Sequence, residues 1–292
     1  RNVPERTEDM KYVTAPKWFE APPVKPPWPG VEPSLADVES HMPNGHPYKD
    51  NRHITWCHET THGLNGNLRN QRVELFPAWN IMTTEMLQST PYRDPQFNQY
   101  KLPRPAGPVD PTVMLGAVNA FYLLGNRAVR LNEPSGIKLS TIANAVPQPL
   151  RGMSYQLYLV QQRQYWENEP LYVHDEWSAY LNGLTTGLEG KGRDGSYSDV
   201  LQPLEFMGYC CCLLRLAIEK GYDAAEELRN LTAYQAARSL MLLKMSDGVI
   251  DNSQAKQYVA AFNQEFAEDL KVWCGLSWYN AVYEGRDFYG VF

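Results

Sequence analysis

Residues 56–67, WCHETTHGLNGN, place His58 and His62 four positions apart, with Glu59 directly after the first histidine. On a helix, positions i and i+4 lie on one face about one turn apart, so both imidazoles can reach a single point. Two histidines in this arrangement provide half of a hydrolytic zinc site. Glu59 lies at the side of that face, where it can act as general base toward a water activated by zinc. A chance match is rare in a chain with six histidines. The stretch therefore predicts a zinc-binding helix over residues 53–69, against the simpler alternative of histidines on a surface helix.

The residues around this motif support opposite expectations about the helix. Ile54, Trp56 and Cys57 are apolar, as expected of a helix buried beneath a cleft. Gly63 and Gly66 follow the motif, and a glycine inside a helix costs up to about 1 kcal/mol. The glycines favour an early end to this helix, soon after the second histidine.

A closed three-ligand site needs another His, Asp or Glu from elsewhere in the chain. The metzincin pattern requires glycine and histidine where this chain has Asn65 and Leu68, which excludes that class. The aspzincin pattern is matched in part by residues 192–198, GRDGSYS, where Asp194 and Tyr197 have the right mutual spacing. The flanking residues of that pattern are absent, so Asp194 stays a weaker alternative.

The segment 172–183, YVHDEWSAYLNG, offers three adjacent candidates in one turn, His174, Asp175 and Glu176. Adjacent helical residues point about 100° apart, so only one of them is expected to face the metal. The first two suit capping roles at the start of a helix, and acidic groups there are favourable without any metal. Helix geometry leaves the third ligand open among these residues, of which Glu176 is one, and makes Asp175 or Asp194 a candidate hydrogen-bond partner of a histidine.

The two motifs together resemble the glutamate zincins. His58-Glu59-x-x-His62 followed by Glu176-Trp177-Ser178-Ala179 is similar to the paired elements of the lethal-factor and Pro-Pro endopeptidase type. This resemblance implies a zincin-like catalytic domain in which Glu176 binds zinc and the small Ala179 lets two helices approach. About 110 residues separate the motifs, which implies an insertion over residues 71–150.

Proline content divides the chain. Residues 1–50 hold 10 of the 22 prolines, a density that predicts an extended arm, with Trp18, Phe19 and Trp28 as anchors on the main body. The arm is either a wrapping connector or a regulatory segment that crosses a cleft. Residues 51–292 are expected to form the zincin-like domain.

The remaining pattern predicts an α+β fold with a small mixed sheet and a mostly helical part over residues 151–292. Residues 71–110 are irregular, and residues 120–139 combine β-branched and aromatic residues with turn signals, which predicts strands. Helices are expected over 154–166, 174–184, 203–220, 224–245 and 251–273. The last has a buried stripe of Tyr258, Phe262, Phe266, Leu270 and Trp273.

Composition limits the partners. A net charge of −6 and a pI near 5.6 argue against nucleic-acid binding. We find no apolar run near the roughly 20 residues of a membrane helix, so no membrane insertion is expected. The five cysteines match neither a disulfide framework nor a CxxC site and are expected to be buried thiols. The compartment stays open, with a secreted or periplasmic location favoured slightly over the cytoplasm, and the oligomeric state is undetermined.

These patterns predict a zinc peptidase that acts on a peptide or protein substrate. Tyr172 is the candidate oxyanion stabiliser, with Tyr165 as the alternative. A strand within 120–131 could pair with an extended substrate, and a cleft rich in tyrosine and tryptophan suits apolar or proline-containing peptides, or glycans. The competing hypothesis is an inactive zincin-fold scaffold with a structural metal, which a fourth protein ligand would favour.

Overall fold

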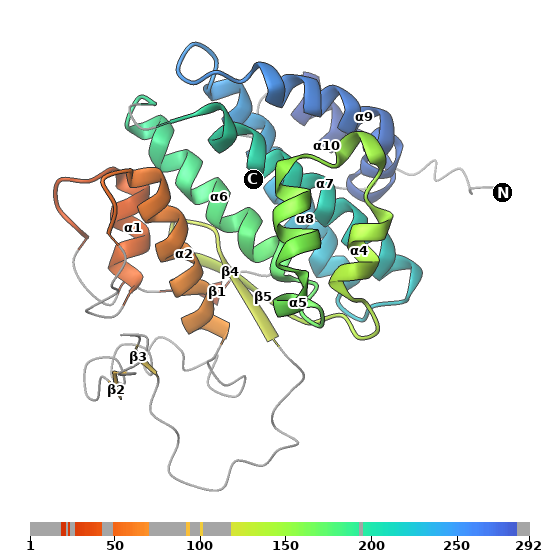
Figure 1. Ribbon diagram of the computed structural model, residues 1–292, viewed down its shortest axis with the longest axis horizontal. Helices are drawn as coiled ribbons and strands as arrows, with labels where there is room; N and C mark the ends of the chain where they lie inside the picture. The colour runs from red at the N-terminus through yellow and green to blue at the C-terminus, as the bar shows by residue number, and fades with distance from the viewer. Residues whose placement is uncertain are drawn as a thin grey trace, which may run out of the picture.

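The computed structural model describes residues 19–21, 23, 27–42, 49–69, 92–93, 100–101, 118–192 and 195–284. Over these residues the chain is mostly helical with a small antiparallel sheet, which agrees with an α+β class (Figure 1). The helices are α1 Pro33–His41, α2 His53–Arg69, α4 Leu139–Ala145, α5 Arg163–Trp166, α6 Tyr172–Glu189, α7 Tyr197–Glu219, α8 Ala225–Met245, α9 Ser253–Cys274 and α10 Leu276–Glu284. A 3-10 turn spans Gln148–Leu150, and a π-helix, η3, spans Tyr155–Gln161.

Helices α2 and α6, which carry the two motifs, lie side by side (Figure 1). Small residues on α6 make this contact close. A Cβ atom added at Gly183 would lie 2.8 Å from the Ile54 carbonyl oxygen, and one added at Gly187 would lie 2.5 Å from Ile54 Cδ1. Ala179, one turn earlier, is fully buried. The small stripe of α6 therefore sets the distance between the two helices that carry the motifs.

A β-hairpin packs against these helices. Strand β4, Val118–Tyr122, pairs antiparallel with β5, Arg127–Asn132, and β1, Phe19–Glu20, adds to the other side of β5. The turn has three residues with positive φ, among them Gly125. A second, two-stranded pairing joins β2, Tyr92–Arg93, to β3, Tyr100–Lys101. The prediction of strands within 120–139 is confirmed up to Asn132, but the expected mixed sheet was wrong, because all described strand pairs are antiparallel.

The helical C-terminal part agrees with the predicted pattern, except that the helix expected over 154–166 is divided into η3 and α5, and that α10 was not predicted. The stripe on α9 is buried as expected, and all five cysteines are buried and free. Helix α7 begins at Tyr197, six residues before the predicted start at Pro203, because Ser196 and Asp199 form a capping box there. Among the described helices, α7 alone is long and apolar enough to cross a membrane, and 72% of its apolar window is buried inside the fold, as in a core helix.

The extended arm predicted for residues 1–50 is wrong for residues 33–41, which form α1. Proline is tolerated at the first helical position because its missing N–H has no partner to lose there, and Pro33 occupies that place. The helix is tied to α6, since the Ser34 hydroxyl donates to Glu189 Oε1 at 2.8 Å. The described part of this segment also shares a hydrophobic cluster with α2, so it belongs to the body of the fold.

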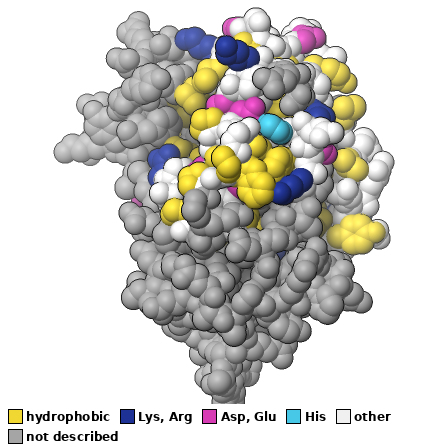
Figure 2. Space-filling model, turned by 90° about the vertical axis from the view of Figure 1, so that its left-hand side faces the viewer, with side chains coloured by type: hydrophobic (Ala, Val, Ile, Leu, Met, Phe, Trp, Pro, Cys, Tyr) yellow, Lys and Arg dark blue, Asp and Glu magenta, His cyan; other side chains and the backbone are white. Residues whose placement is uncertain are grey.

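The face formed by α1 and α2 has an aromatic cluster. The rings of Trp28 and His53 lie edge-on to Trp56, with centroids 6.1 and 5.7 Å away. The Lys49 ammonium lies 3.7 Å from the centroid of the Trp28 ring. Figure 2 shows hydrophobic side chains on this side, gathered beside a histidine and basic groups. Trp28 thus anchors its segment as predicted. Trp18, residues 71–91 and the Phe19 side chain lie outside the described part of the chain.

Helix α2 does not end after its histidine motif. It continues through Gly63 and Gly66 to Arg69. Leu64 and Leu68 are almost fully buried on the same helix. Tertiary packing of an apolar face therefore outweighs the low helix propensity of the two glycines.

Candidate metal centre

His58 and His62 on α2 meet Glu176 on α6 in one cluster. The two Nε2 atoms lie 3.0 Å apart, and Glu176 Oε2 lies 3.7 Å from His58 Nε2 and 3.4 Å from His62 Nε2. Bonds of roughly 2.0–2.1 Å in a tetrahedron separate neighbouring ligand atoms by roughly 3.3–3.4 Å. The three observed distances bracket that value. This buried group can hold a metal ion.

The Glu176 carboxylate is held so that one oxygen faces the histidines. The residue is 4% exposed, and its Oε1 accepts a hydrogen bond of 2.5 Å from the Tyr172 hydroxyl. Its Oε2 is buried and has no hydrogen-bond partner among the described residues. A buried carboxylate oxygen without a partner is costly unless a proton or cation satisfies it. The chemistry of this donor set therefore fits a bound cation.

Asp175, the neighbouring candidate, is not part of the three-residue cluster and contacts His62 instead. His62 Nδ1 lies 3.0 Å from Asp175 Oδ2. A carboxylate that accepts from Nδ1–H leaves the Nε2 lone pair free for a metal and fixes the ring orientation. The expectation that Asp175 is the hydrogen-bond partner of a histidine is confirmed. Asp194, the alternative, lies outside the described residues.

His174 is a core residue and not a ligand. Its side chain is fully buried, and its ring packs 5.7 Å from Phe121 and 5.6 Å from Trp177. Burial lowers the pKa of His174 to about 3, so the imidazole stays neutral in the core. It lies inside the first turn of α6 and not before the helix, as the capping interpretation had assumed.

The pKa values of the two histidines in the cluster are shifted in opposite directions. Burial, with a smaller contribution from His62, lowers the pKa of His58 well below its usual value. Burial acts in the same direction on His62, but the Glu176 and Asp175 carboxylates more than offset it and hold its pKa well above the ordinary value. The raised pKa of His62 favours a proton on its ring, and this proton supplies positive charge to the cluster. A metal ion that bound there would displace the proton.

Glu59 lies beside the cluster without belonging to it. It is partly buried and lines the same pocket as the three ligands. Burial raises its pKa, His62 opposes that change, and the negative charge of Glu176 adds to it. A carboxylate with a raised pKa next to a metal site is suited to accept a proton from a reacting water.

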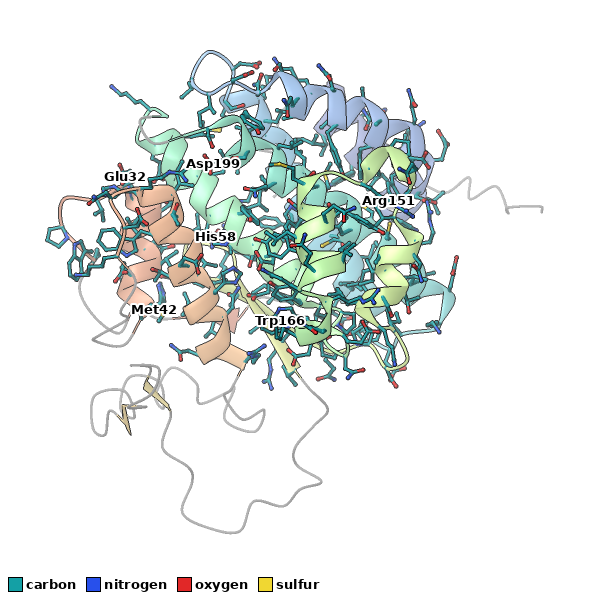
Figure 3. The ribbon with its side chains drawn as sticks, viewed as in Figure 1. Glu32, Met42, His58, Arg151, Trp166 and Asp199 are labelled. Carbon is teal, nitrogen blue, oxygen red and sulfur yellow. The ribbon has the colours of Figure 1, made fainter. Side chains whose placement is uncertain are left out.

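The pocket around the cluster has a volume of about 380 Å³. One wall is aromatic: the rings of Trp166 and Tyr172 stack at 4.2 Å with an angle of 7° between their planes. Figure 3 shows His58 between α2 and α6, and Trp166 at α5. The lining comes from α2, β4, η3, α5 and α6 and comprises His58, Glu59, His62, Gly66, Arg69, Asn119, Tyr158, Gln162, Trp166, Tyr172, Asp175 and Glu176.

The two tyrosines proposed from the sequence as oxyanion stabilisers, Tyr172 and Tyr165, do not have a free hydroxyl in the pocket. The Tyr172 hydroxyl is engaged by Glu176, and Tyr165 is 70% exposed and does not line the pocket. Tyr158, which the sequence analysis missed, lines the pocket, and its hydroxyl lies 2.6 Å from that of Tyr180. Tyr158, Gln162 and Trp166 recur every four residues and share the pocket wall. That spacing was visible in the sequence, but the pocket partner of this face was not.

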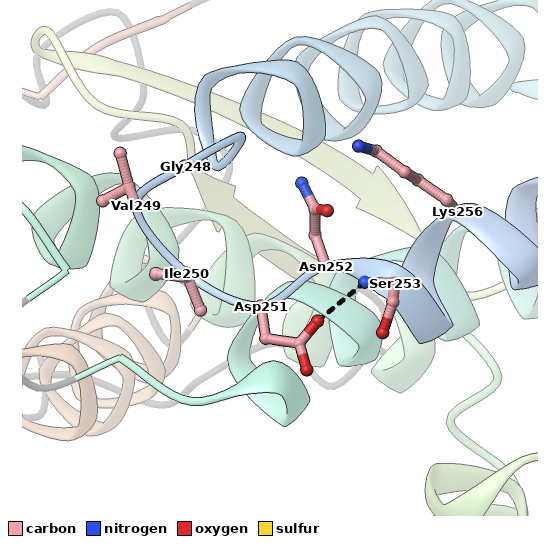
Figure 4. Close-up of a pocket in the computed structure, with 7 residues that line it drawn as sticks. All are labelled: Gly248, Val249, Ile250, Asp251, Asn252, Ser253 and Lys256. Atoms are coloured by element: carbon pink, nitrogen blue, oxygen red, sulfur yellow. Dashed lines mark hydrogen bonds between the residues drawn. The ribbon is translucent and has the colours of Figure 1, made fainter.

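A second hollow, of about 450 Å³, lies at the turn between α8 and α9 (Figure 4). Its polar groups are satisfied within the turn. Asp251 Oδ1 accepts from the Ser253 backbone N–H at 3.0 Å, and Asp247 pairs with Lys256 at 2.6 Å. We therefore place the candidate site at the histidine cluster.

Comparison of the chain with protein-family models, curated proteins and solved structures found no match.

Proposed function

We propose that this chain is a zinc-dependent peptidase of the glutamate-zincin type. The observation that carries the proposal is the spacing of the His58, His62 and Glu176 ligand atoms on two facing helices, inside a pocket that Glu59 also lines. A structural zinc site has four protein ligands, whereas a catalytic one keeps a position open. Among the described residues the cluster supplies three, and all three line the pocket.

The protein side chains have separable roles in this proposal. A bound zinc ion would polarise the substrate carbonyl and lower the pKa of a water to roughly 7. Glu59 accepts the proton of the attacking water and delivers it to the leaving amine. Tyr158 suits stabilisation of the developing oxyanion better than Tyr172, because the Tyr158 oxygen can accept from the Tyr180 hydroxyl and keep its own O–H free, whereas the Tyr172 hydroxyl donates to Glu176.

The substrate we propose is a peptide or protein segment in extended conformation. The edge of β4 that faces away from β5 is one candidate binding element, but the backbone N–H and C=O of Tyr122 are already bonded to Asn65 and Asn182, and the Ala120 N–H to Asn119 Oδ1. Pairing with a substrate is thus restricted to the start of the strand at Val118, which is only half-buried and adjoins the pocket-lining Asn119. The stacked Trp166 offers an apolar surface for a substrate side chain.

The test is Glu59→Gln, with Glu226→Gln, an exposed glutamate in the first turn of α8, as the matched control. The Glu59 variant is expected to keep one zinc ion per chain and to lose about 10²–10⁴-fold in peptide hydrolysis, the usual contribution of a general base. The control is expected to keep both properties. Zinc bound by a wild-type chain that hydrolyses no peptide in a broad library would favour the structural-metal scaffold instead.

A further inference from the structure

Asn65 ties the metal cluster to the sheet. It lies three residues after His62 on the same face of α2 and is 1% exposed. Its Nδ2 donates to Asp175 Oδ1 at 2.5 Å and to Ser178 Oγ at 3.0 Å, and its Oδ1 accepts from the Tyr122 backbone N–H at 2.7 Å. One buried side chain therefore joins α2, α6 and β4.

The direction of these hydrogen bonds follows from chemistry. A backbone N–H can only donate, so the Asn65 oxygen must face Tyr122. The amide nitrogen must then face Asp175, whose ionised carboxylate can only accept. With one oxygen of Asp175 held by Asn65, its other oxygen is directed at His62 Nδ1, 3.0 Å away.

We propose that Asn65 is a positioning residue for the metal centre, acting through Asp175 to hold His62. This inference rests on the metal site of the proposed function. Asn65 fixes the Asp175 carboxylate, and Asp175 fixes the tautomer and the angle of the His62 ring, which leaves Nε2 in the cluster, 3.4 Å from Glu176 Oε2. Groups that orient a ligand histidine typically change metal affinity 10–100-fold when removed.

The fold contains a matched control. Asn182 on α6 is as buried as Asn65 and binds the same strand residue, since its Nδ2 donates to the Tyr122 carbonyl oxygen at 3.0 Å. It also contacts Thr61 Oγ1 at 3.2 Å and accepts from Arg238 Nη1 at 2.9 Å. Asn182 thus joins the same three elements but contacts neither Asp175 nor a ligand histidine.

The experiment measures Zn²⁺ affinity by chelator competition and the visible absorption of the Co²⁺-loaded chain. Asn65→Leu removes both roles of the amide, whereas Asn65→Asp keeps shape and the acceptor for Tyr122 but loses the donor to Asp175. Asp175→Asn alone and in combination with Asn65→Leu completes a double-mutant cycle. Asn182→Leu is the control, and thermal unfolding of each metal-free variant reports the fold.

Both Asn65 variants are expected to weaken Zn²⁺ binding by roughly 10-fold or more and to shift the Co²⁺ spectrum. The double variant is expected to match Asp175→Asn, and Asn182→Leu to keep wild-type affinity and spectrum. Wild-type affinity in the Asn65 variants, additive losses in the cycle, or an equal loss in Asn182→Leu would overturn the inference. Because no readout is hydrolysis, an inactive wild type that shows the expected affinities defeats only the proposed peptidase, whereas a wild type that binds no Zn²⁺ overturns both.

Discussion

Replacement of Gly183 by alanine is expected to weaken Zn²⁺ binding by increasing the spacing between α2 and α6. The added Cβ would lie 2.8 Å from the Ile54 carbonyl oxygen, about 0.6 Å inside ordinary contact. A backbone oxygen of α2 cannot rotate away, so the two helices must separate by a similar amount. The distance of 3.7 Å from His58 Nε2 to Glu176 Oε2 would then grow further beyond the tetrahedral value. We expect Zn²⁺ affinity to fall on the order of 10-fold or more.

Gly187→Ala is the matched comparison, one turn along the same helix. Its Cβ would meet only side-chain atoms, Ile54 Cδ1 and Cγ1, which can move by a change of rotamer. Both substitutions gain about 1 kcal/mol of helix propensity, so the variants differ mainly in what the methyl group meets. Chelator competition measures the affinity and thermal unfolding the stability. If Gly183→Ala bound Zn²⁺ as tightly as Gly187→Ala, helix spacing would not set the geometry of the site.

Three further outcomes are expected. Gly66→Ala meets nothing within 4 Å and should raise the free energy of unfolding by up to about 1 kcal/mol, with unchanged Zn²⁺ affinity; a loss of stability in thermal unfolding would refute this. Burial raises the pKa of Glu133 to about 7, partly opposed by its hydrogen bonds to Leu171 N–H and Asn119, so the folded chain binds the proton more readily than the unfolded chain between pH 4.5 and 7. As the pH rises from 4.5 to 7, the free energy of unfolding of the wild type should fall by about 3 kcal/mol relative to Glu133→Gln, measured by urea unfolding, and an identical pH dependence of the two chains would contradict the assignment. Removal of metal by a chelator should lower the unfolding temperature of the zinc-loaded wild type but leave that of His58→Ala unchanged; an equal shift in both would place the metal elsewhere.

The sequence predicted the parts of the site that depend on local periodicity. The spacing of His58 and His62 specified a helix face, and the adjacency of Asp175 and Glu176 meant that one of them had to point elsewhere. The structure places Glu176 in the cluster and Asp175 on His62. Both inferences needed only the geometry of a single helix.

The roles of Asn65 and Tyr158 were not predictable in this way. Their function depends on partners 110 and 22 residues away along the chain, which no local pattern identifies. Helix α1 was missed for a different reason. Proline density was averaged over residues 1–50, although the segment after Pro33 contains no proline until residue 43.

A crystal structure of the zinc-loaded chain, with the ion located by anomalous scattering, would show how the metal is bound. We expect one zinc ion bonded to His58 Nε2, His62 Nε2 and Glu176 Oε2 at roughly 2.0–2.2 Å, with a water in the fourth position. Asp175 should hydrogen-bond His62 without touching the ion. A zinc ion elsewhere, a cluster in which Glu176 does not coordinate, or a fourth protein ligand in place of water would contradict this expectation.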